Sequence, residues 1–263
     1  MTREKKTIII TGASSGLAAA LAIKYSQKGH RLFLLARSKD RLEAVAKICV
    51  ANGAEANILV VVDVADSTQM EKQLNEIAYK YGIDIVIACA GVSAGTLDGP
   101  ETASQVRKIF ATNINGVINT VLPVIPHMIE RRSGNIVIVS SMAGFLGLSS
   151  APSYSASKGA VRLFSEALRG YLRVWGIYVT TVIPGYIKTP MTSVNNFPMP
   201  FMTTAEEAAE KIINSVAKNI EVIAFPFGMQ FCIKLLTMLP SWLITFINSK
   251  LPGKPAFEKN NEF

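Results

Sequence analysis

The stretch Thr7–Ala18 reads TIIITGASSGLA and decides the fold. Its first residues, Thr7–Ile10, form a short apolar run typical of a strand, and an apolar helical pattern follows over Ala19–Tyr25. Gly12 and Gly16 lie in the turn between them. Such a turn lets backbone N–H groups approach a pyrophosphate at the positive end of the helix dipole. Two spaced glycines also fit an ordinary turn, so the assignment needs a second motif.

Strands and helices alternate along the rest of the chain. Further strands are predicted at Arg31–Ala36, Asn57–Val62, Asp84–Cys89, Asn135–Ser140, Ile177–Ile183 and Glu221–Ala224. Further helices are predicted at Lys39–Asn52, Ser67–Tyr81, Glu101–Arg132 (interrupted by Pro123 and Pro126), Pro152–Trp175 and Thr204–Lys218. Alternation of this kind implies a parallel sheet covered on both faces, with ligands at the carboxyl edge of its strands. We therefore predict a single-domain α/β Rossmann fold over residues 1–263, doubly wound and mostly parallel, with about seven strands.

Composition narrows the classes of partner. The chain has 263 residues, 49% of them hydrophobic, and a formal net charge of +8. A basic balance suits nucleic acid, an anionic membrane or an anionic cofactor. Because no basic run is interleaved with aromatic residues, we expect no nucleic-acid partner. The charge is assigned to a solvated surface and a site for an anionic cofactor.

Cysteine usage and hydropathy point to a reducing compartment. Cys49, Cys89 and Cys232 are odd in number and lack the spacing of metal ligands. They indicate free thiols, a cytoplasmic location and no metal site. No secretory signal precedes the glycine-rich turn, and no run reaches the ~20 apolar residues of a membrane span.

The second motif is Tyr154–Lys158, which reads YSASK, with Ser141 upstream at the end of a predicted strand. Four residues of spacing put Tyr154 and Lys158 on one face of a helix. A Lys ammonium beneath the phenol lowers a pKa that is ~10 in free tyrosine. A phenol tuned in this way exchanges a proton with a carbonyl or alcohol oxygen, which Ser141 can also hydrogen-bond. The pattern predicts an acid–base site that interconverts alcohol and carbonyl.

With both motifs in place, the chain resembles the short-chain dehydrogenase/reductase family over about residues 6–225. Matching segments follow the family's order: the cofactor loop Thr11–Leu17, Ala90-Gly91, the helix asparagine Asn113, the catalytic Ser141, Tyr154 and Lys158, and Pro184-Gly185 with Thr189. The predicted cofactor contacts are Gly12, Ser14, Ser15, Gly16, Leu17, Arg37, Asp63, Val64, Ala90, Gly91, Tyr154, Lys158, Pro184, Gly185, Ile187 and Thr189. The family is commonly dimeric or tetrameric, so the resemblance implies a homodimer or homotetramer.

Two positions depart from the family pattern. Ala18 stands where a third glycine is usual, and we expect slightly looser packing of the helix on the sheet. Ala88-Cys89 replaces the usual paired asparagines, so the loop is expected to lose side-chain hydrogen bonds that brace the sheet. Neither change touches a proton-transfer group.

Arg37 decides between the two nicotinamide cofactors. It directly follows the second predicted strand, where an acidic residue binds the ribose hydroxyls of NAD and a basic one accommodates the 2′-phosphate of NADP. An Arg fork suits a phosphate, so NADP(H) is preferred over NAD(H). Asp63 matches the family's adenine contact, although an Asp that caps a strand end fits too.

The resemblance implies a role for each catalytic residue. Tyr154 donates the proton to the carbonyl oxygen, and Ser141 orients that oxygen. Lys158 lowers the Tyr154 pKa and binds the nicotinamide ribose. Asn113 holds a water that continues the proton relay, and Thr189, with the backbone near Ile187, fixes the nicotinamide amide.

Residues 190–203 are rich in Met, Phe and Pro. In the family this region caps the substrate, so we expect an adaptable apolar lid and a hydrophobic carbonyl or alcohol substrate. Ordinary packing of a lid on the core fits the same composition. Phe145 and Leu146 are predicted to line the same cleft.

The apolar extension 225–251 is divided by Pro240, and each half is too short to span a bilayer. It fits pocket or subunit packing, and also a peripheral contact with a membrane interface. Residues 254–263 are predicted to be a polar, frayed tail.

Other functions compete with an NADP(H)-dependent carbonyl reductase. The alternatives are a 3-oxoacyl thioester reductase of the same family and a non-catalytic NADP(H)-binding sensor or scaffold. A third alternative is a sugar-nucleotide epimerase or dehydratase on a related fold. Such proteins have a longer chain with a larger C-terminal substrate region, which 263 residues hardly permit. A P-loop phosphotransferase is excluded because no Gly-Lys-Ser/Thr follows the glycine-rich turn.

Overall fold

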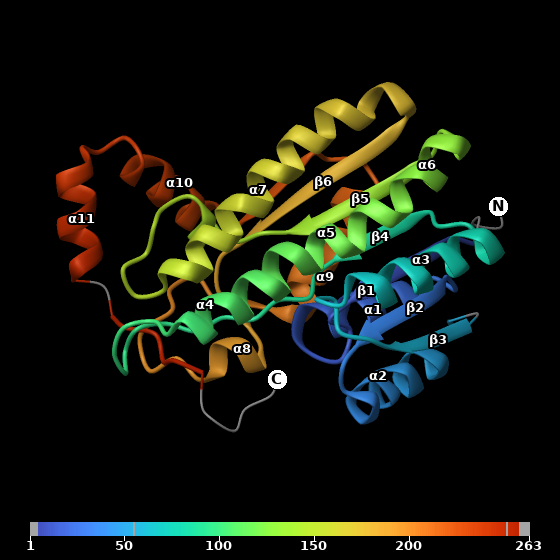
Figure 1. Cartoon of the computed structure of the whole chain (residues 1–263), viewed down its shortest axis with the longest axis horizontal. Helices are drawn as coiled ribbons and strands as arrows, with labels where there is room; N and C mark the ends of the chain where they lie inside the picture. Colours follow the sequence, from blue (N-terminus) through green and yellow to red (C-terminus); the bar gives the residue numbers. More distant parts are fainter. Residues whose placement is uncertain (1–4, 55, 251, 258–263) are drawn as a thin grey trace.

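The computed structural model describes residues 5–54, 56–250 and 252–257. Its centre is a seven-stranded, all-parallel sheet in the order β3-β2-β1-β4-β5-β6-β9 (Figure 1). The strands are β1 (Thr7–Thr11), β2 (Arg31–Ala36), β3 (Ala56–Val61), β4 (Ile85–Ala88), β5 (Gly134–Val139), β6 (Ile177–Pro184) and β9 (Val222–Phe225). This confirms the predicted doubly wound, Rossmann-like fold.

The central strands are buried on both faces, which explains their continuous apolar runs. Every residue of β1 is buried, and Ile9 pairs with Phe33 of β2 on one side and Val86 of β4 on the other. From β1 the chain moves outward through β2 and β3, and from β4 it moves the opposite way. The carboxyl ends of β1 and β4 therefore form the switch point where such folds bind ligands.

Helices cover both faces of the sheet. One buried cluster joins the sheet to α1 (Gly16–Ser26), α2 (Lys39–Ala51) and α9 (Ala205–Val216). The other joins it to α3 (Ser67–Tyr81), α5 (Gly116–Val121), α6 (Ile125–Arg131) and α7 (Pro152–Leu172), and α4 (Ala103–Phe110) precedes α5. In Figure 1, α4, α5 and α7 cross in front of the sheet. The two layers leave the carboxyl edge of the strands open for a site.

The predicted helical region 101–132 is broken into shorter pieces. A π-helical turn, Ala111–Asn115, separates α4 from α5, and a 3-10 turn at Leu122–Val124 separates α5 from α6. Pro123 lies in the second break, as expected, but the first has no proline. By length and composition alone, the stretch Ala103–Arg131 could cross a membrane. Its buried residues belong to the core beside the sheet, which accounts for its hydropathy.

Short elements that the sequence analysis did not predict follow β6. β7 (Ile187–Lys188) pairs in parallel with β8 (Thr203–Thr204), and α8 (Pro190–Ser193) lies between them. The segment predicted as a lid is thus tied at its base.

Two apolar helices, α10 (Phe227–Leu236) and α11 (Ser241–Ser249), follow β9 and project to one side of the sheet (Figure 1). Beyond them the chain returns, and residues 252–257 run along the loop 93–98. The prediction of a frayed tail is therefore wrong for Lys254–Phe257, because backbone hydrogen bonds hold this segment. Residues 258–263 lie outside the described residues.

Candidate active site

The turn between β1 and α1 approaches two other segments closely. Gly12 has φ +73°, and a Cβ there would lie 2.8 Å from the Ala90 Cα beyond β4. Gly16 has φ +56°, and its Cβ would lie 3.2 Å from Thr189 Cγ2. Positive φ and these distances both require glycine. The turn can therefore close against its neighbours, and its residues line the cavity at the start of α1, where the helix dipole favours an anion.

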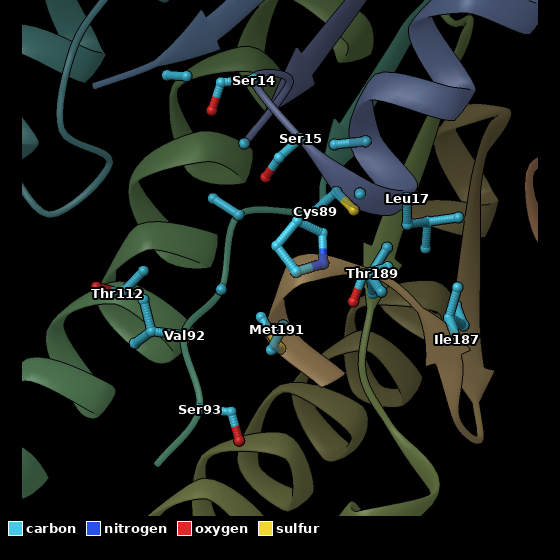
Figure 2. Close-up of a pocket in the computed structure, with 18 of the residues that line it drawn as sticks. Ser14, Ser15, Leu17, Cys89, Val92, Ser93, Thr112, Ile187, Thr189 and Met191 are labelled. Carbon is cyan, nitrogen blue, oxygen red and sulfur yellow. The ribbon is translucent and has the colours of Figure 1, made fainter. Parts of the chain in front are cut away.

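One cavity runs along this edge of the sheet (Figure 2). All the predicted cofactor contacts line it: Gly12, Ser14, Ser15, Gly16, Leu17, Arg37, Asp63, Val64, Ala90, Gly91, Tyr154, Lys158, Pro184, Gly185, Ile187 and Thr189. Ser141 lines it as well. The fold thus brings together residues that are spread over almost two hundred positions of the sequence.

The cavity also contains residues that sequence reasoning missed. They include Ser38, Arg41, Ser93 and Thr112. Arg41 lies in the first turn of α2, and its closeness in sequence to Arg37 was the only signal that could have identified it. Ser93 carried no motif, because only the loop geometry brings it to the cavity.

The end of the cavity near α2 is basic. Arg37 Nη1 lies 3.8 Å from Asp63 Oδ2, and both side chains are partly exposed, at 38% and 44%. Arg41 and Ser38 line the same end, and no acidic residue follows β2 directly. These donors can hold an anionic group such as a phosphate.

At the other end lies the predicted acid–base group. Tyr154 and Lys158 come from one turn of α7, and Ser141 follows β5 at the start of a short 3-10 turn. Ser141 Oγ accepts from the Ala143 N–H at 3.1 Å and also hydrogen-bonds with Tyr154. Burial raises the pKa of Tyr154 above its usual value, and the Ser141 hydrogen bond partly opposes this. The phenol therefore holds its proton at neutral pH.

This differs from the expected lowering of the Tyr154 pKa by Lys158. The Lys158 ammonium lies 5.9 Å from the centroid of the Tyr154 ring and donates to the Val139 carbonyl oxygen at 3.0 Å. Burial lowers the pKa of Lys158 itself to about 8. Desolvation by burial is the largest cause of the pKa shift of each group, so the expectation of a lowered Tyr154 pKa is wrong here.

Asn113 lies behind the cavity wall rather than on it. It sits in the π-helical turn and is fully buried. Its Oδ1 accepts from Val92 N–H at 2.8 Å, and its Nδ2 donates to Val92 O at 2.9 Å and Ser157 Oγ at 3.0 Å. The side chain therefore braces the Gly91–Ser93 loop against α7, a role that the prediction of a water-holding residue did not include.

The two departures from the family pattern have visible consequences. Thr11 Oγ1 accepts from the N–H groups of Cys89 at 3.1 Å and Ala90 at 3.3 Å, and donates to Ile87 O at 3.3 Å. It links β1 to the end of β4, so the loop has a side-chain brace despite lacking asparagines. Ala18 is 3% exposed and belongs to the core. Burial raises the pKa of the Cys89 thiol to about 12, so it stays protonated.

The lid segment contributes Met191, Thr192 and Val194 to the cavity. Tyr186, a residue that sequence reasoning missed, packs edge-on against Phe197 and its charge would raise the Tyr154 pKa. Phe145 and Leu146 do not line this cavity. They line a separate depression beside α11, together with Thr245 and Asn248. The prediction that Phe145 and Leu146 line the same cleft as the lid is therefore wrong.

These features define a Rossmann-type protein with a cleft that runs along a glycine-rich turn and ends at a Tyr–Lys–Ser group. The sequence model of the short chain dehydrogenase family matches residues 6–198, and the chain belongs to that family of oxidoreductases. It is 36% identical to an uncharacterized oxidoreductase of Myxococcus xanthus over 90% of this chain and 93% of that one. It is 33% identical to the 3-oxoacyl-(acyl-carrier-protein) reductase of Buchnera aphidicola, over 81% and 90%.

Solved structures show the same fold. The short-chain dehydrogenase from Sphingobium yanoikuyae in complex with NADPH superposes with a TM-score of 0.78 at 25% identity, covering 97% of this chain and 99% of that chain.

Proposed function

We propose that this protein is an NADP(H)-dependent oxidoreductase that interconverts a carbonyl and a secondary alcohol on a hydrophobic substrate. The observation that carries the proposal is the placement of Tyr154, Ser141 and Lys158 at one end of the cavity, with the glycine-rich turn along it and Arg37 at the other end. The site joins a proton donor to a dinucleotide cleft.

Each residue has a role in this proposal. A bound nicotinamide supplies or accepts the hydride. Tyr154 keeps its proton until a carbonyl oxygen gains negative charge, and then transfers it. Ser141 hydrogen-bonds the same oxygen and orients it. Lys158 binds the ribose and stabilises the phenolate that the transfer leaves behind. Asn113 keeps the loop that faces the nicotinamide in place.

The preference for NADP(H) rests on Arg37, Ser38 and Arg41. Two guanidinium groups and a hydroxyl at the end of β2 suit a 2′-phosphate, and no carboxylate directly follows that strand to bind the ribose hydroxyls of NAD. The NADPH complex of the Sphingobium yanoikuyae relative agrees with this choice. Arg37→Ala should raise the KM for NADPH at least about tenfold and leave the KM for NADH nearly unchanged.

The test is consumption of NADPH, with NADH alongside, across ketones, aldehydes and 3-oxoacyl thioesters. Turnover with NADPH and much less with NADH supports the proposal. Preference for NADH would refute the role of Arg37 while the catalytic assignment stands. Absence of turnover despite cofactor binding would favour a non-catalytic sensor.

A second candidate is reduction of a 3-oxoacyl thioester. The relative from Buchnera aphidicola carries that name, and the net charge of +8 would suit an acidic carrier protein. Comparison of 3-oxoacyl carrier protein with the corresponding short thioester separates the two. A large gain in kcat/KM with the carrier favours the second candidate.

Two further features belong to the same proposal. Residues 190–203 act as the substrate lid of a single domain, with Met191 and Val194 facing the cleft. Residues 225–250 present an apolar surface, because α10 buries none of its residues and α11 buries only Asn248. We infer that this surface packs against a second subunit or contacts a membrane interface. We expect a peripheral, cytoplasmic protein that forms a homodimer or homotetramer.

A further inference from the structure

The C-terminal segment 252–257 is fixed against the active-site loop by its backbone. Gly95 N–H donates to Pro255 O at 2.7 Å, Leu97 N–H donates to Lys254 O at 2.9 Å, and Ala256 N–H donates to Asp98 Oδ2 at 3.0 Å. Phe257 packs against a small buried cluster next to this loop. The side chain of Lys254 is therefore not needed to hold the segment in place.

That side chain points toward the catalytic tyrosine. Lys254 Nζ donates to Ser93 Oγ at 2.6 Å and lies 5.6 Å from the centroid of the Tyr154 ring. Ser93 lines the cavity at the end opposite Ser14 and Ser15 (Figure 2). The Lys254 ammonium is thus beside the proposed proton donor and is bonded to a serine of the cavity wall.

The Lys254 ammonium has no acidic partner among the described residues. Among the described residues no carboxylate pairs with Lys254, and of those that line the cavity only Asp63, at the Arg37 end, is acidic. An ammonium has three donors, and Ser93 takes one of them. Burial lowers the pKa of Lys254 to about 8, so at pH 7 the group still carries its charge for most of the time. A buried cation without an anion is costly unless a ligand completes it.

We propose that Lys254 binds an anionic oxygen group, a carboxylate or a phosphate, that the carbonyl substrate carries close to its reacting carbon. This rests on the proposed function and narrows its substrate class to amphiphilic carbonyl compounds with one acidic group. Met191 and Val194 of the lid would contact the apolar part, and Lys254 would fix the acidic end. The returning segment is then one wall of the substrate site.

The test measures binding, so it does not depend on turnover. The full-length protein, saturated with the oxidised cofactor that it binds, is titrated by calorimetry with 4-acetylbenzoate, its methyl ester and 4-acetylphenyl phosphate. The variants are Lys254→Met and Lys254→Gln. Lys250→Met is the matched control, because Lys250 Nζ also lies over an aromatic ring, 5.8 Å from the centroid of Phe246, but at the C-terminal end of α11, a helix that contributes no residue to the cavity. Thermal melting of each variant checks that it folds.

We expect the wild type to bind the carboxylate or the phosphate at least about tenfold more tightly than the ester, since a charge-assisted hydrogen bond is lost in the ester. The tighter of the two identifies the acidic group. Both Lys254 variants should lose that preference and keep the affinity for the ester, and Lys250→Met should behave as the wild type. Equal affinities for acid and ester, no binding of any of the three compounds, or a preference that survives Lys254→Met would overturn the proposal.

Failure of the proposed function looks different. If none of the carbonyl compounds supports NADPH oxidation but the acid still binds through Lys254, the anion site stands and the proposed reductase activity is refuted. If neutral ketones are reduced and Lys254→Met has no effect on acid binding, the reductase activity stands and the anion site is refuted.

Discussion

Tyr154 and Lys158 illustrate how burial sets the chemistry of single residues. Lys158 is buried and Tyr154 is half-buried on the cavity wall, and desolvation favours the neutral form of each. A neutral phenol is what reduction requires, because the carbonyl oxygen takes up a proton. The ammonium then becomes the group whose charge is lost first as pH rises.

Replacement of Tyr154 by Phe removes the proposed proton donor and little else. We expect NADPH oxidation to fall by about 10²–10⁴-fold, with the dissociation constant for NADPH nearly unchanged. Steady-state rates and fluorescence titration measure the two quantities. Tyr171→Phe, an exposed tyrosine of the same helix at 62% exposure, is the control and should retain full activity. A Tyr154→Phe variant with wild-type rates would refute the assignment.

The pH profile of reduction should follow Lys158. Its pKa is lowered to about 8, so its charge is present at pH 7 and is lost as pH rises through about 8. Tyr154, with a raised pKa, stays protonated over this range. We therefore expect kcat/KM for a neutral ketone to fall above about pH 8. Lys254, whose pKa is also about 8, and Cys89, at about 12, face the same site.

Lys254→Met separates the two lysines. If Lys158 governs the profile, the fall near pH 8 persists in that variant with a neutral ketone. A profile that stays level to pH 9 in the wild type would contradict the prediction.

At the scale of elements, the hairpin of α10 and α11 exposes large apolar side chains to solvent. Phe227, Met238 and Trp242 are 79%, 82% and 71% exposed. Phe231, Leu235 and Phe246 are also exposed, and Lys234 and Lys250 lie among them. Asn248 ties α11 to the β5–α7 loop by donating to Gly147 O at 2.8 Å. Large apolar groups mixed with lysines are typical of helices that lie in a membrane interface.

The protein should therefore bind vesicles of phosphatidylcholine and phosphatidylglycerol. Trp242 emission should shift to shorter wavelength, and sedimentation should show binding that weakens with salt. The double variant Phe227→Ser, Phe231→Ser should bind at least about tenfold more weakly, since each buried Phe contributes about 1.5–3 kcal/mol.

The control for this experiment is the double variant Tyr79→Ser, Val174→Ser, which removes residues that are 85% and 74% exposed outside the hairpin. It should bind vesicles as the wild type does. Unchanged binding by the Phe227, Phe231 variant would contradict a membrane role. A change in oligomeric state instead would point to subunit packing.

Regular elements could be predicted from sequence where local pattern and burial agree. The strand Arg31–Ala36 has the predicted bounds because a continuous apolar run marks it. The helix Ser67–Tyr81 has the predicted bounds because its apolar residues follow the helical period. β7 and β8 could not be found, since two-residue strands carry no periodicity and form only when distant segments meet. The π-helical turn at Ala111–Asn115 could not be predicted either, because its sequence contains no proline or glycine that would indicate a break in the helix.

The candidate site divides in the same way. Motif residues such as Gly12 and Tyr154 could be placed because their spacing reflects local geometry. Ser93 and Lys254 are 161 positions apart and meet only because the chain returns after α11. No local pattern contains that contact, and the same holds for Asn113 bracing Val92.

At the scale of the whole molecule, cofactor binding should stabilise the fold as a unit. The cleft is lined by segments from β1 to α8, so a ligand there joins most of the sheet. At about 100 times its dissociation constant, NADPH adds about 2.7 kcal/mol to the free energy of unfolding. For a protein of this size the melting temperature should rise by roughly 5 to 10 °C, which differential scanning calorimetry measures.

NADH at the same concentration should produce a smaller shift. In the double variant Arg37→Ala, Arg41→Ala the two cofactors should become equivalent, because the groups proposed to bind the 2′-phosphate are gone. Equal shifts in the wild type would contradict the preference for NADP(H).

The contact between α1 and α9 has a consequence for synthesis. The buried, alanine-rich surface of α1 packs against α9, which begins roughly 180 residues later in the chain. At about 5–20 residues per second, a ribosome needs roughly 10 to 40 s to supply that covering helix. During this interval the nascent chain carries an open apolar face on its first helix. Chaperones that recognise such surfaces are therefore expected to engage the growing polypeptide before α9 emerges.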